Sequence, residues 1–122
     1  SCIEDSHMQA MSASMMDERD VMIILSYSGA TKDTVYVAGI AKEAGAKIVA
    51  ITRYRKSPLA AYADEILLCG ADESPLDGGS LGVKISQLYL VDLLFQEYFH
   101  QYKDEANENL KKTSKAVVEK LY

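Results

Sequence analysis

Three short apolar runs, each followed by helical periodicity or a loop, set the organisation of the chain. The runs are Val21–Leu25, Lys47–Thr52 and Glu65–Cys69. Continuous apolar runs of this length are typical of strands buried on both faces of a parallel sheet. Strands that alternate with helices form βαβ units, whose right-handed crossovers place helices on both sides of the sheet. The pattern therefore predicts an α/β fold, a three-layer α/β/α sandwich with a parallel sheet.

The segment after the first run has helical periodicity. Its apolar residues recur at i, i+3, i+4 and i+7, and they are Val37, Ile40, Ala41 and Ala44. Gly45 follows as the expected residue after the C-cap, where the left-handed conformation favours glycine. The segment "RYRKSPLAAYAD" between the second and third runs predicts a loop and a short helix.

A first helix is expected before these runs. Ser6 and Gln9 have the spacing of a capping box, and Met8, Met11 and Met15 follow at helical intervals. No Cys or His joins the methionines in a ligand pattern, so a methionine-lined core face is favoured over a soft-metal site. The residues before it, Cys2 to Glu4, are compatible with the end of a short strand.

A long helix is expected from Leu81 to Lys103. One apolar stripe contains Leu88, Val91, Phe95, Tyr98 and Tyr102, while Leu90, Leu94 and Phe99 extend it almost around the helix. A helix that is apolar on more than one side is buried on more than one side. In so small a chain the second side predicts contact with another subunit, hence a homodimer through residues 81–103. The remaining residues predict an amphipathic terminal helix.

Composition and charge narrow the classes of function. The chain has 122 residues and a formal net charge of −5, which argues against general affinity for nucleic acid or for an anionic membrane surface. No apolar run approaches the length of a membrane span, and no signal peptide opens the chain. Cys2 and Cys69 are far apart and lack metal-ligand spacing, so they indicate reduced thiols and a cytoplasmic protein. We expect no cofactor and no metal, and the missing initiator Met predicts a trimmed chain.

The loop "SYSGAT" (residues 26–31) holds the candidate chemistry. It follows the first strand, and ligands of open parallel sheets bind at the carboxyl ends of the strands. Gly29 permits a tight turn, and the following helix start offers free amides and the positive end of its dipole. The hydroxyls of Ser26, Ser28 and Thr31 add donors without a fixed positive charge. This combination favours a phosphate cradle, although Ser28 or Thr31 could instead serve only as an N-cap.

The same loop resembles the S-x-S-G-x-T phosphate loop of SIS (sugar isomerase) domains, which bind phosphosugars. The resemblance continues through "AGAKIVAIT" and "SPLAAYADEILL". Within that superfamily, "EDSHMQ", "ISQLYLVDLLF" and "LKKTSKAV" are most similar to the RpiR family of bacterial transcription regulators. The likeness covers nearly the whole chain.

This resemblance implies an SIS-like, flavodoxin-like topology and a non-catalytic sensor. The implied phosphate-binding residues are Ser26, Tyr27, Ser28, Gly29, Ala30 and Thr31. The implied ligand is a phosphorylated sugar of the hexose, hexosamine or N-acetylmuramic acid phosphate class. DNA would be bound only through a helix-turn-helix domain that this chain lacks. An SIS domain also begins with a helix and a strand ending in a G-x-G-x-S-like turn, so we expect residues 1–122 to be an N-terminally incomplete domain without its first strand.

The segment "GGSLG" (residues 78–82) matches the G-x-S-x-G nucleophile elbow in letters only. No strand precedes it, and His100 lies too far along the following helix to reach back to Ser80. Two interpretations are preferred to a hydrolase triad. One is a helix start at the mouth of the sugar site, with Gly79 or Ser80 touching the ligand, and the other, equally favoured, is a plain loop.

Several basic residues are candidates for steering an anionic ligand, although each could instead be an ordinary solvated side chain. Arg53, Arg55 and Lys56 follow the second strand, so they share an edge with the phosphate loop and could steer an anion, as could Lys32. Loop cations are more often simply solvated.

Three classes of function remain open. A sensor needs only affinity for the sugar. An isomerase or lyase would need a proton-transferring base. The candidates for that base are His7, Glu73 and Glu97. His7 is also a candidate sugar contact. A binding domain for another phosphorylated ligand is the third class.

Overall fold

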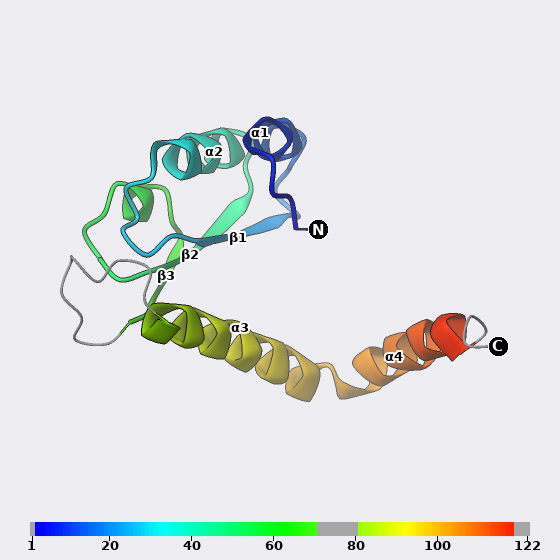
Figure 1. The fold of residues 1–122 in the computed structure, drawn as a ribbon. Coiled ribbons are helices and arrows are strands. Elements are labelled where there is room, and N and C mark those ends of the chain that lie inside the picture. The colour runs from blue at the N-terminus through cyan, green and yellow to red at the C-terminus, as the bar shows by residue number, and fades with distance from the viewer. Residues whose placement is uncertain (1, 71–80, 119–122) are drawn as a thin grey trace. The chain divides into compact units, whose positions relative to one another are not determined.

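The computed structural model describes residues 2–70 and 81–118 (Figure 1). The chain divides into two compact units, Ser1–Gln87 and Leu88–Tyr122. The described elements, in chain order, are α1 (Ser6–Ser14), β1 (Val21–Leu25), α2 (Lys32–Glu43), β2 (Lys47–Thr52), the short 3-10 helix η1 (Leu59–Ala61), β3 (Glu65–Leu68), α3 (Leu81–Gln101) and α4 (Lys103–Val118).

The three strands form one parallel sheet in the order β1-β2-β3, as the pattern of apolar runs predicts. Val21 pairs with Lys47 and Leu25 with Ile51 at the two ends of the β1–β2 ladder. β3 ends at Leu68, one residue before the expected end at Cys69. All three strands therefore present their carboxyl ends to one edge of the sheet, and the connection from β1 to α2 lies at that edge.

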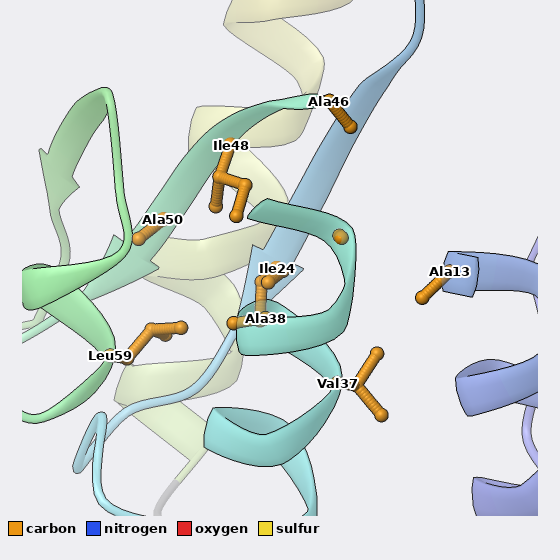
Figure 2. Packing of buried hydrophobic residues seen from close by; sticks show 9 residues of the cluster. Ala13, Ile24, Val37, Ala38, Ala46, Ile48, Ala50 and Leu59 are labelled. Atoms are coloured by element: carbon orange, nitrogen blue, oxygen red, sulfur yellow. The ribbon is translucent and has the colours of Figure 1, made fainter. Parts of the chain in front are cut away.

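The core lies between the sheet and helix α2, and α1 packs against α2 beside it (Figures 1 and 2). Its buried members are mostly small: Ala13, Ile24, Val37, Ala38, Ala41, Ala46, Ile48, Ala50 and Leu59. Small side chains on both elements allow a helix to approach a sheet closely, because interiors are packed at the density of organic crystals. The loop of residues 26–31 connects the carboxyl end of β1 to the amino end of α2.

The first turns of α3 lie on the side of the sheet opposite α2 (Figures 1 and 2). Val83 is buried there, and the Ser86 hydroxyl accepts a hydrogen bond from the Gly70 amide at 2.7 Å. β1 receives no such cover among the described residues. Val21, Ile23 and Leu25 are 55%, 51% and 47% exposed, so the prediction that this strand is buried on both faces is wrong for the described part of the chain.

Helix α1 differs from its predicted details. Asp5, not Ser6, is the N-cap, and its carboxylate accepts a hydrogen bond from the Met8 amide at 2.9 Å. Met8 and Met15 are more than half exposed, as is Met11, so the expected methionine-lined core face is wrong. Ala13 faces the core instead, with Ala10 and Met16 packed against it. The described residues before the helix, 2–5, contain no strand.

Helix α2 ends where the sequence predicts. Gly45 follows the C-cap with φ of +95°, the left-handed conformation. Asp64 then joins this helix to the sheet: one carboxylate oxygen accepts from the Lys42 ammonium at 2.5 Å, and the other accepts from the Ile48 amide at 2.8 Å. These two donors, the Lys42 ammonium above all, lower the pKa of the Asp64 carboxyl, which therefore stays ionised and keeps both contacts near neutral pH.

The expected single helix from Leu81 to Lys103 ends at Gln101, and α4 begins at Lys103 (Figure 1). Apolar side chains beyond Gln87 are exposed on several sides of α3: Leu88, Tyr89, Val91, Leu93, Leu94, Phe95 and Tyr98. On α4, Ala106 is buried while Leu110 and Val117 are exposed. Neither helix, nor any other in the described ranges, has the length and hydropathy needed to cross a membrane.

Candidate phosphate site

The loop from Ser26 to Thr31 makes a compact turn between β1 and α2. The Ser26 amide donates to the Ile51 carbonyl at 3.0 Å, which carries the β1–β2 ladder one residue past the strand. The Ser26 carbonyl then accepts from the Gly29 amide at 3.1 Å and closes the turn. Ser28 and Thr31 are exposed, whereas Ser26 is only 8% exposed. The loop therefore presents two hydroxyls to solvent at the carboxyl edge of the sheet.

Gly29 is the residue that makes this turn possible. Its φ is +60°, a conformation that costs other residues about 1–2 kcal/mol. A Cβ placed on Gly29 would lie 2.2 Å from the Ser57 Oγ and 2.9 Å from the Thr52 Oγ1. The loop thus packs directly against the residues that end and follow β2.

The start of α2 offers hydrogen-bond donors without partners. Among the described residues, no protein group accepts from the amides of Ser28, Thr31, Lys32 or Asp33. The N-cap residue is Thr31, yet its side chain makes no capping hydrogen bond. The Ser28 hydroxyl accepts from the Ala30 amide at 3.2 Å, which stabilises the turn. Unpartnered amides at a helix N-terminus attract an anion, and the helix dipole acts in the same direction.

The carboxyl ends of all three strands meet beside this loop. The Arg53 amide donates to the Tyr27 carbonyl at 3.0 Å, and the Arg53 guanidinium donates to the Gly70 carbonyl at 3.4 Å. The Tyr27 ring lies close to Gly70 and packs edge-to-face on Tyr54, with ring centroids 6.2 Å apart. Arg53 is therefore a cross-link between the strand ends, while Arg55, Lys56 and Lys32 are exposed.

The other sequence candidates lie on other elements than this loop. His7 is exposed on α1, and His100 and Glu97 are exposed on α3. Within the described part of the chain, His7 forms no hydrogen bond or ion pair with the loop. Gly79, Ser80 and Glu73 lie outside the described residues, and so does the "GGS" part of the elbow-like segment. Their assignments stay predictions.

Two residues that contact the phosphate loop were not predicted from the sequence. Thr52 and Ser57 touch the position of the Gly29 Cβ, although they are 23 or more positions away in the chain. Thr52 reads as the last residue of a strand and Ser57 as part of a loop. No local pattern marks a residue whose importance comes from a contact between two loops, so no signal in a single sequence could have found them.

A shallow groove of about 600 Å³ borders the loop along α2. It shares Ala30 and Lys32 with the loop region and continues past Tyr36 and Tyr62, without Ser26, Ser28 or Thr31. The groove and the row of free amides are therefore adjoining but separate features. In the described ranges, His, Cys, Asp and Glu side chains form no group of three that could hold a metal ion.

Cys69 is a buried residue, only 3% exposed. Burial raises the pKa of its thiol, opposed by a hydrogen bond from the Gln87 side chain. The thiol is consequently protonated at neutral pH, and it is a packing residue rather than a nucleophile.

Comparison with known proteins identifies the kind of domain to which this geometry belongs. The family model described as "SIS domain" matches residues 2–96. The chain therefore belongs to the SIS domain family, and the parallel sheet with its phosphate-loop motif agrees with that assignment.

Two relatives that are similar over most of this chain are RpiR and NanR. The chain is 39% identical over 113 residues to the HTH-type transcriptional regulator RpiR of Escherichia coli K12. The aligned region covers 93% of this chain and 38% of the regulator. The Vibrio vulnificus NanR protein complexed with ManNAc-6P superposes with a TM-score of 0.87 and 33% identity, over 98% of this chain and 45% of that one. The chain thus spans about two fifths of the length of these relatives.

A solved structure named for a phosphosugar isomerase is less similar to this chain than RpiR and NanR are. A candidate phosphosugar isomerase from Salmonella typhimurium superposes with a TM-score of 0.52 and 26% identity, over 60% of this chain and 22% of that one. The similarity to regulators is the broader one, in identity and in the share of the chain that it covers.

Proposed function

We propose that this chain is the phosphosugar-binding effector domain of a bacterial transcription regulator of the RpiR type. The observation that carries the proposal is the row of unpartnered amides at Ser28 and Thr31–Asp33, beside the exposed hydroxyls of Ser28 and Thr31. The similarity to RpiR and to NanR supports the regulator context, and the ManNAc-6P held by NanR supports the ligand class.

The proposed ligand enters with its phosphate against residues Ser26–Thr31. Amides and hydroxyls can share the three phosphate oxygens, and the dipole of α2 favours the dianion. No lysine or arginine is required in contact with the phosphate, so binding stays weak enough to be reversible. His7, Gly79 and Ser80 remain candidates for contacts with the sugar, which belongs to the hexose, hexosamine or N-acetylmuramic acid phosphate class.

Binding without turnover is part of the proposal. Isomerisation needs a base held within hydrogen-bond reach of the sugar carbons and tuned by a neighbour. In the described ranges, the groups with displaced pKa values are Asp17, Arg19, Asp64 and Cys69, which form ion pairs or lie buried. Tight phosphate binding alone does not lower a chemical barrier. The alternative is an isomerase or lyase using His7 or Glu97, which the likeness to the Salmonella protein supports.

A homodimer through α3 is the second element of the proposal. Exposed apolar side chains occupy several sides of this helix beyond Gln87, and so wide an apolar surface is typical of an interface. In the whole protein we assign DNA binding to a helix-turn-helix segment outside this chain, since the net charge of −5 disfavours it here. A cytoplasmic location follows from that role.

The unpaired edge of β1 supports a further strand in the complete domain. β1 lies at one edge of the described sheet, and Val21, Ile23 and Leu25 are about half exposed. Edge strands with apolar side chains are normally paired or covered. We therefore keep the expectation of an additional strand, contributed by residues outside this chain.

Replacing Ser28 by Ala should weaken phosphosugar binding at least about tenfold, because one hydrogen bond to a charged acceptor is worth about 1.5–3 kcal/mol. Isothermal calorimetry with ManNAc-6P and with glucose 6-phosphate measures the change. Ser14→Ala is the matched control, because the Ser14 hydroxyl donates only to the Met11 carbonyl within α1.

Equal affinity in the wild type and Ser28→Ala would move the phosphate site away from this loop. The same samples, followed by NMR, report turnover of the bound sugar. Conversion that stops in His7→Ala or Glu97→Gln would show the isomerase alternative to be correct.

A further inference from the structure

Two carbonyl groups of the phosphate loop, those of Tyr27 and Gly29, accept hydrogen bonds from the end of β2 and the segment that follows it. The Tyr27 carbonyl accepts from the Arg53 amide at 3.0 Å and from the Thr52 hydroxyl at 3.2 Å. The Gly29 carbonyl accepts from the Leu59 amide at 2.9 Å. These donors all come from the end of β2 and the turn that follows it. The segment Thr52–Leu59 therefore holds the loop from the side opposite its free amides.

This arrangement matters for an anion because a peptide carbonyl carries a partial negative charge. A loop binds phosphate through its amides only when neighbouring carbonyls turn away from the ligand. A peptide unit fixes both groups at once, since its amide and carbonyl point in opposite directions. Holding the Tyr27 carbonyl therefore orients the amide of Ser28, which belongs to the same peptide unit.

Thr52 supplies a side-chain hydrogen bond to this peptide unit. It is 0% exposed, so it has no access to a ligand. Its hydroxyl donates to Tyr27, accepts from the Tyr54 amide at 3.4 Å, and lies 2.9 Å from the position of a Gly29 Cβ. A valine would fill the same volume and satisfy neither hydrogen bond.

We propose that Thr52 is a positioning residue of the phosphate site: its buried hydroxyl fixes the Tyr27–Ser28 peptide so that the Ser28 amide faces the ligand. The inference rests on the proposed function, because it concerns the orientation of the same loop. It adds a residue that lies outside the loop and never touches the sugar phosphate.

Thr52→Val tests this role, because it removes the hydroxyl at nearly constant volume. Affinity for inorganic phosphate and for ManNAc-6P, measured by calorimetry, should fall by the same factor, about tenfold. Thr52→Ser retains the hydroxyl and should bind both ligands within about twofold of the wild type. Thr52→Ala replaces the valine variant if that variant fails to fold.

Ile48→Val separates positioning from general destabilisation. Ile48 is fully buried in the same strand, and the change should lower stability by about 0.5–1.5 kcal/mol. The folded Ile48→Val protein should keep wild-type affinity. A Thr52→Val protein that binds as the wild type does, or an Ile48→Val protein that loses as much affinity, would overturn the inference. A wild type that binds none of the ligands would instead overturn the proposed function, and this inference with it.

Discussion

Gly29→Ala should abolish measurable phosphosugar binding and strongly destabilise the first unit. Alanine would adopt the φ of +60° at a cost of about 1–2 kcal/mol, and its Cβ would collide with Ser57 at 2.2 Å. Overpacking of a tight site costs about 1–3 kcal/mol, so the free energy of unfolding should fall by about 2–5 kcal/mol in total. Urea denaturation and calorimetry with a phosphosugar measure the two effects.

Gly39→Ala is the matched control within α2. A Cβ at Gly39 would meet the Tyr62 ring at 3.6 Å, an ordinary van der Waals contact. Alanine in a helix interior is favoured over glycine by about 0.5–1 kcal/mol, so this variant should be at least as stable as the wild type. A Gly29→Ala protein of unchanged stability would show that the turn does not need the left-handed conformation.

Leu88→Glu combined with Phe95→Glu should convert a dimer into a monomer. Both side chains are exposed in this chain, at 68% and 56%, and they lie seven residues apart on one face of α3. Burying two unpaired carboxylates in an interface is costly, so the dimer dissociation constant should rise at least about a hundredfold. Sedimentation velocity at micromolar concentration measures it.

Gln96→Glu adds a charge to the same helix beside Asp92 rather than among the apolar side chains, and it should leave the dimer intact. Circular dichroism should show unchanged secondary structure in the double variant, because exposed side chains contribute little to the fold of one chain. A wild type that sediments as a monomer would disprove the interface on α3.

The order of elements and the direction of the strands could be predicted from the sequence. β1 and β2 have the bounds that their apolar runs indicate, and Gly45 ends α2 as expected. These features depend on local pattern. The choice of buried face was harder: Met11 has helical spacing but is exposed, while Ala13 is buried. Hydrophobicity alone cannot rank two apolar faces, because the small side chain packs closer to α2.

In the candidate site, too, the local motif could be predicted from the sequence and the contacts between distant residues could not. Residues Ser26–Thr31 are contiguous, so their motif is visible in the sequence, and the structure adds that Thr31 does not cap α2 with its side chain. The contacts of Thr52 and Ser57 with Gly29 arise only when two loops fold against each other. Such contacts between distant positions have no counterpart in local spacing or composition.

Amide chemical shifts of the 15N-labelled protein, recorded during titration with ManNAc-6P, test most directly whether the Ser26–Thr31 loop binds the phosphate. We predict that the largest shifts occur at Ser28 and Thr31–Asp33, and that inorganic phosphate moves the same amides in the same direction. Shifts confined to the lysines of α4, or an absence of saturable shifts with every phosphosugar, would contradict the account.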